Sequence, residues 1–315
     1  MGRRIRVRSA GGCLRAIFVL AVLCVIVVLG VRVLRSQQAG FSQQDVPPPQ
    51  EGLSELNPRA NQYETIRKTQ EDIHRGDLVL VNQDAPYEFL EDIDLVCLCD
   101  VDHDSYQVKN ENVLVARQIT EPLNDLMDDF YGIYHTDAVM VISGHRTYDY
   151  QQGLLNDEIE EQGEVEAYNW VAVPGSSEHH TGLAFDVCLY DDGERADYDG
   201  TGDFAWINQN AYRYGFIVRY QEDKAAVTGI SHEPWHFRYV GIPHAYVMKQ
   251  EGFCYEEYID FLREYRYGDT HLLVTYGGRS WEIYYTEDTE VPVPKDKGYS
   301  ISGNNVDGFI VTAAY

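Results

Sequence analysis

Basic residues are scarce in this sequence outside its first 40 residues. The 315 residues include 25 Lys and Arg against 51 Asp and Glu, which gives a formal net charge of −26. The first 40 residues hold seven arginines and no acidic residue, so the rest of the chain carries a formal charge of −33. Nucleic-acid binding depends on Lys and Arg side chains that neutralise phosphates. The deficit of basic residues therefore excludes a nucleic acid as partner.

Long apolar runs are also absent, except for one uncharged stretch at residues 16–31. This run is shorter than the about 20 residues of a full membrane span, but Val33 and Leu34 extend it and Arg32 can snorkel toward the headgroups. Five arginines precede the run and two follow it, which predicts a cytoplasmic N-terminus by the positive-inside rule. Residues 1–35 are therefore predicted to be a basic flank and a single-pass transmembrane anchor, with the remaining chain on the extracytoplasmic side.

The apolar run has two other interpretations. One is a cleaved signal peptide, although no A-x-A-like cleavage site follows the run. The other is a buried core helix, although five arginines directly upstream would be an unusual entrance to a core. We favour the uncleaved anchor. Residues 36–60 are rich in Gln, Ser, Pro and Gly without an apolar period, which predicts a linker between this anchor and the folded part.

Residues 61–267 alternate between helical and extended patterns of apolar residues. This alternation predicts an α+β domain with a central, mainly antiparallel sheet and flanking helices. The expected strands are 77–82, 138–143, 182–190 and 236–241, and the expected helices are 116–132, 146–163 and 203–215.

Residues 268–315 have a different pattern, in which short strand-like pieces are joined by turn residues. The expected strands lie in 271–278, 281–288 and 298–314, and the proline-containing stretch 291–298 reads as a break. These residues are predicted to form a small β appendage.

Cysteines are few, and only four lie outside the predicted anchor: Cys97, Cys99, Cys188 and Cys254. An extracytoplasmic location permits disulfides. Cys97 and Cys99 are too close in sequence to pair readily with each other, and their spacing does not fit a zinc knuckle. The sequence leaves the pairing of these cysteines open.

The stretch "SSEHHTGLAFDV", residues 176–187, combines adjacent histidines with an acid and a glycine. In a strand over residues 182–188, Asp186 projects from the face opposite Phe185. Gly182 lets the backbone bend, so that the imidazole of His179 and the carboxylate of Asp186 converge. From chemistry alone, His180 is an equally good candidate for the imidazole.

A second stretch, "SHEPWHFRYV" at residues 231–240, supplies the remaining groups. The HExxH helix of many zinc peptidases is absent, and Pro234 disfavours a helical Glu233. An extended segment would present His236 beside a strand with Glu233 nearby. Together with His179 and Asp186, these residues match a catalytic zinc site, which has three protein ligands, an open position and a base. Each residue alone is more often structural, but their joint spacing is specific.

These motifs, with "SGHRTYDYQ" at residues 143–151, resemble the VanY-like D-alanyl-D-alanine carboxypeptidases. This family belongs to a group of zinc peptidases that includes lysostaphin-type enzymes and the hedgehog domain. The resemblance covers roughly residues 75–265 and implies the hedgehog/D-Ala-D-Ala peptidase-like fold. The anchor, the linker and the β appendage lie outside it.

The resemblance also implies a role for each matching residue. One zinc ion per chain would be held by His179, Asp186 and His236, which leaves His180 as the variable position. Glu233 would be the general base, Arg146 would stabilise charge on the scissile carbonyl oxygen, and Gln151 and Ser177 would line the substrate pocket. The sequence departs from the family at His145, where relatives commonly carry an aromatic residue.

The implied function is removal of the terminal D-Ala from the pentapeptide stems of peptidoglycan, at the bacterial cell membrane. The zinc ligands do not distinguish this D,D-cleavage from L,D-cleavage of tetrapeptide stems, which is one alternative. A zinc-containing, non-catalytic cell-wall-binding module is an alternative of a different class, but it has no need for both Glu233 and Arg146.

Overall fold

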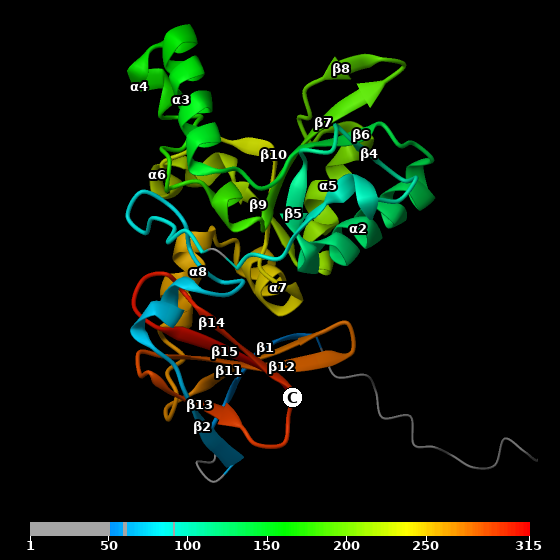
Figure 1. Ribbon diagram of the computed structural model, residues 1–315. Coiled ribbons are helices and arrows are strands. Elements are labelled where there is room, and N and C mark those ends of the chain that lie inside the picture. The colour runs from blue at the N-terminus through cyan, green and yellow to red at the C-terminus, as the bar shows by residue number, and fades with distance from the viewer. Residues whose placement is uncertain (1–50, 59–61, 91) are drawn as a thin grey trace, which may run out of the picture. The chain divides into compact units, whose positions relative to one another are not determined.

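The computed structural model describes residues 51–58, 62–90 and 92–315 (Figure 1). The predicted anchor and its flank, residues 1–35, lie outside the described residues, as do residues 36–50 of the predicted linker. Among the described residues, no helix has both the length and the apolar character needed to cross a bilayer.

A six-stranded sheet forms the centre of the predicted catalytic region, which confirms the α+β class. Its strands follow the order β4-β6-β7-β10-β9, and β8 pairs with the outer part of β7. The pair β4–β6 is parallel and the other pairs are antiparallel, as the sequence predicted. The strands are β4 (Gln107–Val108), β6 (Val139–Ser143), β7 (Ala184–Asp191), β8 (Glu194–Ala196), β9 (Phe216–Tyr220) and β10 (Glu233–Tyr239).

The helix α2 (Thr120–Tyr134) covers one face of this sheet, and Figure 1 shows α5 (Ala205–Asn210) beside it. The buried residues of α2 recur at helical spacing, and they pack in one cluster with Phe185 and Val187 of β7. Asp186 therefore projects to the opposite face. The remaining helices are α3 (Tyr148–Gln162), α4 (Glu164–Ala167), α6 (Ala225–Thr228), α7 (Ile242–Glu251) and α8 (Tyr255–Leu262).

Short 3-10 helices complete the connections. In the described residues, they are η2 (Gln70–His74), η3 (Leu98–Asp100), η4 (Arg117–Ile119), η5 (Glu178–Thr181), η6 (Gly202–Phe204), η7 (Ala211–Tyr214) and η8 (Glu222–Lys224). The predicted helix at 203–215 is divided between η6, α5 and η7.

A second, five-stranded sheet contains the C-terminal strands in the order β1-β11-β12-β15-β14, and β13 pairs with β2 beside it. Two of these strands, β1 and β2, come from the N-terminal end of the described chain. The bounds are β1 (Gly52–Leu56), β2 (Tyr63–Arg67), β11 (His271–Tyr276), β12 (Arg279–Thr286), β13 (Glu290–Pro294), β14 (Tyr299–Gly303) and β15 (Phe309–Ala314).

Two predictions for these segments were wrong. The predicted linker 36–60 contains β1, which has little apolar pattern because it forms an edge and is held by backbone pairing to β11. The predicted break at 291–298 contains β13. Its prolines, Pro292 and Pro294, are compatible with a strand because β13 pairs on one side only, with β2.

The C-terminal strands share a buried core with α7 and α8. Val247 of α7 and Leu262 of α8 pack in one cluster with Leu272, Ile283 and Ile310 of the second sheet. The described residues accordingly form one compact unit, and the predicted appendage is packed against the predicted catalytic region.

The predicted strand at 77–82 does not pair with another strand, although its four apolar residues are buried. Its backbone groups have side-chain and loop partners instead. The guanidinium of Arg238 donates to the carbonyl oxygens of Asp77 and Val79, at 2.9 and 3.0 Å. The amide of Leu80 donates to the carbonyl oxygen of Asn304. The prediction of a strand was therefore wrong, because the hydrogen-bond partners of this stretch are not strands.

Cys97 and Cys99 form a disulfide, which corrects the expectation that they would not pair. The strand β3 (Leu95–Cys97), which pairs with β5 (Leu114–Ala116), passes directly into η3. This turn brings the two Cα atoms to 5.3 Å, inside the range that a disulfide requires. Cys188 and Cys254 are buried thiols.

Candidate active site and metal centre

Three neighbouring strands bring polar side chains to one place on the central sheet. Because β7 lies between β6 and β10, Asp186 is opposite His236 on one side and opposite Ser143 on the other. Directly opposed residues have Cβ atoms about 4.5–5.5 Å apart. The register therefore places the His236 imidazole beside the carboxylate, with Nδ1 2.9 Å from Asp186 Oδ1.

His179 reaches the same place from a turn. It lies in η5, which ends at Gly182 in the left-handed conformation, with φ of 71°. Glycine adopts this conformation readily, and a Cβ at this position would lie only 3.1 Å from the backbone nitrogen of Ala116. The turn leads into β7 and leaves His179 Nε2 3.1 Å from Asp186 Oδ2.

The structure thus brings together the three residues that the sequence predicted as zinc ligands. All three are buried, and their ligand atoms lie within 4.8 Å of one another. His180, the alternative imidazole, is not in this group. Its Nδ1 lies 2.7 Å from the carbonyl oxygen of Arg146, and its Nε2 accepts from the amide of Gly175 at 3.0 Å. His180 therefore stabilises the backbone at Arg146 through these hydrogen bonds.

The tautomer of His179 shows that the cluster fits a metal ion. Its Nδ1 lies 2.6 Å from the carbonyl oxygen of Gly144, which can only accept, so Nδ1 carries the proton. Burial and the charge of Arg146 lower the pKa of His179 to about 4, so the ring is neutral. Its Nε2 lone pair has no hydrogen-bond partner among the described residues and faces the Asp186 carboxylate. Two buried electron-pair donors that face each other fit a cation, and His and Asp suit zinc.

Glu233 is the carboxylate beside this cluster. It starts β10, where Pro234 keeps it extended, and its Oε2 lies 3.8 Å from Nδ1 of His236. Burial raises the pKa of Glu233 to about 8. A divalent cation at the cluster would favour the ionised form of this carboxyl group. Glu233 is therefore placed to exchange a proton near neutral pH.

Arg146 follows β6 and lies on the other side of the cluster. Its Nη2 donates to Oδ2 of Asp186, and its Nε donates to Oγ of Ser143 at 2.9 Å. Its Nη1 lies 3.4 Å from Oε1 of Gln151. These contacts hold the guanidinium of Arg146 at a cavity that Glu233 also lines.

A cavity of about 300 Å³ lies at this place, and all seven predicted site residues line it: Arg146, Gln151, Ser177, His179, Asp186, Glu233 and His236. The indoles of Trp170 and Trp235, which stack with centroids 6.5 Å apart, line its wall. The lining of the cavity therefore combines charged side chains with aromatic rings. His145 is not among the residues that line it.

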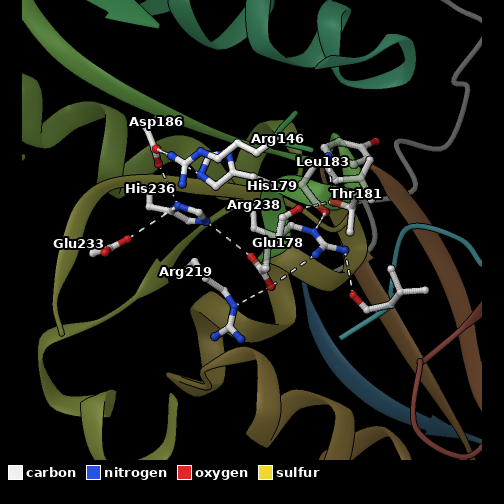
Figure 2. A network of polar contacts seen from close by, with 12 residues as sticks. Arg146, Glu178, His179, Thr181, Leu183, Asp186, Arg219, Glu233, His236 and Arg238 are labelled. Atoms are coloured by element: carbon white, nitrogen blue, oxygen red, sulfur yellow. Dashed lines mark hydrogen bonds and ion pairs between the residues drawn. The ribbon is translucent and has the colours of Figure 1, made fainter. Parts of the chain in front are cut away.

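Trp170, Trp235 and a third residue beside the site were not predicted from the sequence. Glu178, directly before His179, is completely buried and is linked to His236, Arg219 and Arg238 (Figure 2). Sequence reasoning missed it because its partners lie on later strands, Arg219 on β9 and Arg238 on β10.

Comparison with known proteins agrees with this geometry. The family model described as VanY, D-alanyl-D-alanine carboxypeptidase, matches residues 114–242. A D-alanyl-D-alanine carboxypeptidase of Enterococcus faecium is 34% identical over 95% of this chain and 96% of its own length.

Solved structures show the same likeness. The vancomycin-resistance D,D-dipeptidase VanXYg, in complex with a D-Ala-D-Ala phosphinate analogue, is 33% identical, with a TM-score of 0.72 over 80% of this chain and 99% of that chain. The LD-carboxypeptidase LdcB is 31% identical, with a TM-score of 0.52 over 62% of this chain and 94% of that chain.

Proposed function

The chain belongs to the VanY family of zinc-dependent D-alanyl-D-alanine carboxypeptidases, and from this premise we propose that it removes the terminal D-Ala from the pentapeptide stems of peptidoglycan. The observation that carries the proposal is the single cavity that all seven predicted site residues line. A cavity lined by charged side chains and aromatic rings suits the C-terminal end of a peptide, which carries a carboxylate. Membership of an enzyme family disfavours the non-catalytic wall-binding module.

In the proposed site, His179, Asp186 and His236 hold one zinc ion per chain. When bound, zinc supplies Lewis acidity, which makes a water molecule nucleophilic near neutral pH. Glu233 accepts the proton of the attacking water and then passes it to the leaving amine. Its position beside His236, without being one of the convergent ligands, suits this exchange.

Arg146 stabilises the negative charge that develops on the scissile carbonyl oxygen. Donors of this kind typically contribute about 10²–10³-fold to the rate. The contacts of Arg146 with Ser143 and Gln151 hold its guanidinium before substrate arrives, so little reorganisation is needed during the reaction. Gln151 is itself fixed, because its Nε2 donates to the carbonyl oxygen of Ala172 at 2.9 Å. Ser177, on the same cavity wall, completes a polar surface for the terminal carboxylate.

We expect the purified, zinc-loaded protein to remove one alanine from a pentapeptide muropeptide and none from a tetrapeptide muropeptide. The two scissile bonds differ in the stereocentre on the acyl side, so pocket shape and not the ligand set decides between them. Mass spectrometry of both substrates after incubation measures the outcome, with the Glu233→Gln variant as the inactive control.

Loss of alanine from the tetrapeptide alone would contradict the D,D-assignment. It would support the second candidate, an L,D-carboxypeptidase, which the likeness to LdcB favours. Loss from neither substrate would contradict both candidates.

We further propose that the enzyme is a single-pass protein of the bacterial cell membrane with its catalytic part on the extracytoplasmic side. The basic flank and apolar run within residues 1–35 support this location, and peptidoglycan lies on that side. The full-length protein is expected to fractionate with membranes, and a protease added to intact protoplasts is expected to digest the part that follows residue 60. A mature N-terminus located after residue 35 would contradict the anchor and indicate a cleaved signal peptide.

A further inference from the structure

Glu178 is a buried carboxylate next to the site that no step of the proposed reaction uses. Its side chain has no exposed surface, and it lies on the far side of His236 from Asp186 (Figure 2). Glu178 Oε2 and His236 Nε2 lie 3.7 Å apart. Neither atom has a hydrogen-bond partner among the described residues. The two unpaired atoms therefore lie next to each other in the protein interior.

Two arginines fix the other oxygen of Glu178. Arg219 of β9 donates its Nε to Glu178 Oε1 at 2.7 Å, and Nη1 of Arg238 lies 3.4 Å from the same oxygen. Arg219 also pairs with Glu256 of α8, at 3.0 and 2.6 Å. Because both guanidiniums are themselves anchored, the carboxylate cannot turn, and Oε2 remains directed at His236.

Nδ1 of His236 lies 2.9 Å from Oδ1 of Asp186, so a cation bound at the cluster would take the place of a proton between these two atoms. With that cation in place, the direction of the Glu178 oxygen favours the remaining ring proton on Nε2. An ionised carboxylate only accepts hydrogen bonds, so it favours the imidazole form that has its proton on Nε2. That form leaves a lone pair on Nδ1, which is the nitrogen beside Asp186 and toward Glu233. At 3.7 Å the contact is longer than a normal hydrogen bond of 2.7–3.2 Å, but it still acts as an attraction between charge and dipole.

We infer that Glu178 is a positioning residue, which holds His236 with its proton on Nε2 and its Nδ1 lone pair on the metal side. The inference rests on the proposed function, because it takes His236 to be a zinc ligand. Partners of this kind on metal-bound histidines typically account for 10–100-fold in metal affinity. The competing explanation is that Glu178 only neutralises two buried arginines.

A matched pair of variants separates these explanations. Glu178→Gln and Glu256→Gln each remove one carboxylate charge from Arg219, but only Glu178 faces His236. In Glu178→Gln, the arginines require the amide oxygen on their side, so the amide NH₂ faces His236 Nε2. A donor in this place opposes a proton on Nε2.

The first measurement is zinc affinity, determined by competition with a chromophoric chelator, on variants whose fold is checked by circular dichroism. We expect Glu178→Gln to bind zinc about 10–100-fold more weakly than the wild type, and Glu256→Gln to bind it as the wild type does. Equal affinities in Glu178→Gln and Glu256→Gln would overturn the inference.

The second measurement needs no variant and can therefore overturn the inference even if Glu178→Gln does not fold. Nitrogen-15 NMR of the zinc-loaded wild type reports which ring nitrogen of His236 carries the proton. We expect a protonated Nε2 and a metal-bound Nδ1, and a protonated Nδ1 would overturn the inference. Zinc binding that survives His236→Ala would instead show that the proposed ligand set is wrong, which is a separate failure.

Discussion

Replacement of Glu233 by Gln is expected to lower kcat by about 10²–10⁴-fold, the usual contribution of a general acid–base, while one zinc ion remains bound. The amide has nearly the shape of the carboxylate but cannot take the proton of the attacking water. Glu233 is not one of the three convergent ligands, so the metal site does not depend on it. Hydrolysis of a peptide ending in D-Ala-D-Ala gives the rate, and metal analysis of the same sample gives the zinc content.

The control for this variant is Glu222→Gln, which removes a glutamate charge from the exposed 3-10 helix η8, away from the cavity lining. Glu222→Gln should turn over at the wild-type rate. A Glu233→Gln enzyme with near-normal kcat would show that another group moves the proton.

Alanine at His179 or at His236 is expected to abolish zinc binding at micromolar metal, and with it carboxypeptidase activity. Removal of a ligand should weaken zinc binding by more than the loss of about 10–100-fold in affinity that accompanies removal of an outer partner. Two donors would remain, whereas catalytic zinc sites have three protein ligands. Metal analysis after dialysis, together with kcat/KM, measures both effects.

His180→Ala is the control for these variants, because His180 is a histidine in the same 3-10 helix that contacts backbone groups of Arg146 and Gly175. This variant should keep its zinc. Metal loss in His180→Ala but not in His179→Ala would reverse the assignment of the first ligand.

The sequence predicted the parts of the fold that local patterns determine. The strand-like alternation of residue types around Asp186 identified β7, helical spacing identified α2 and α3, and Pro234 correctly indicated an extended Glu233. The three zinc candidates could be found because their spacing carries a chemical pattern. The chemistry of the residues alone left the choice between His179 and His180 open, and only the family resemblance implied His179. The structure distinguishes the two imidazoles by their hydrogen-bond partners.

Apart from the local Cys97–Cys99 disulfide, the errors concern contacts between segments that are far apart in the chain. The pairing of β1 with β11 joins residues more than 200 positions apart, and no local pattern in the sequence indicates it. The stretch 77–82 has the short apolar run of a buried strand, but two of its carbonyl groups bond to the side chain of Arg238. Glu178 was missed for the same reason, because its partners Arg219 and Arg238 lie on two later strands.

The anchoring of Arg238 to the carbonyl groups of Asp77 and Val79 limits how far the enzyme can be reduced to a minimal fragment. The family-matched segment 114–242 holds every proposed site residue, but it excludes both carbonyl groups and also Glu256, the second partner of Arg219. A fragment cut at those bounds would bury two guanidiniums with one carboxylate between them, and uncompensated buried charge is strongly destabilising. The family-matched segment therefore contains the proposed site residues but is not an autonomous folding unit. Such a unit must extend at least from Asp77 to Glu256.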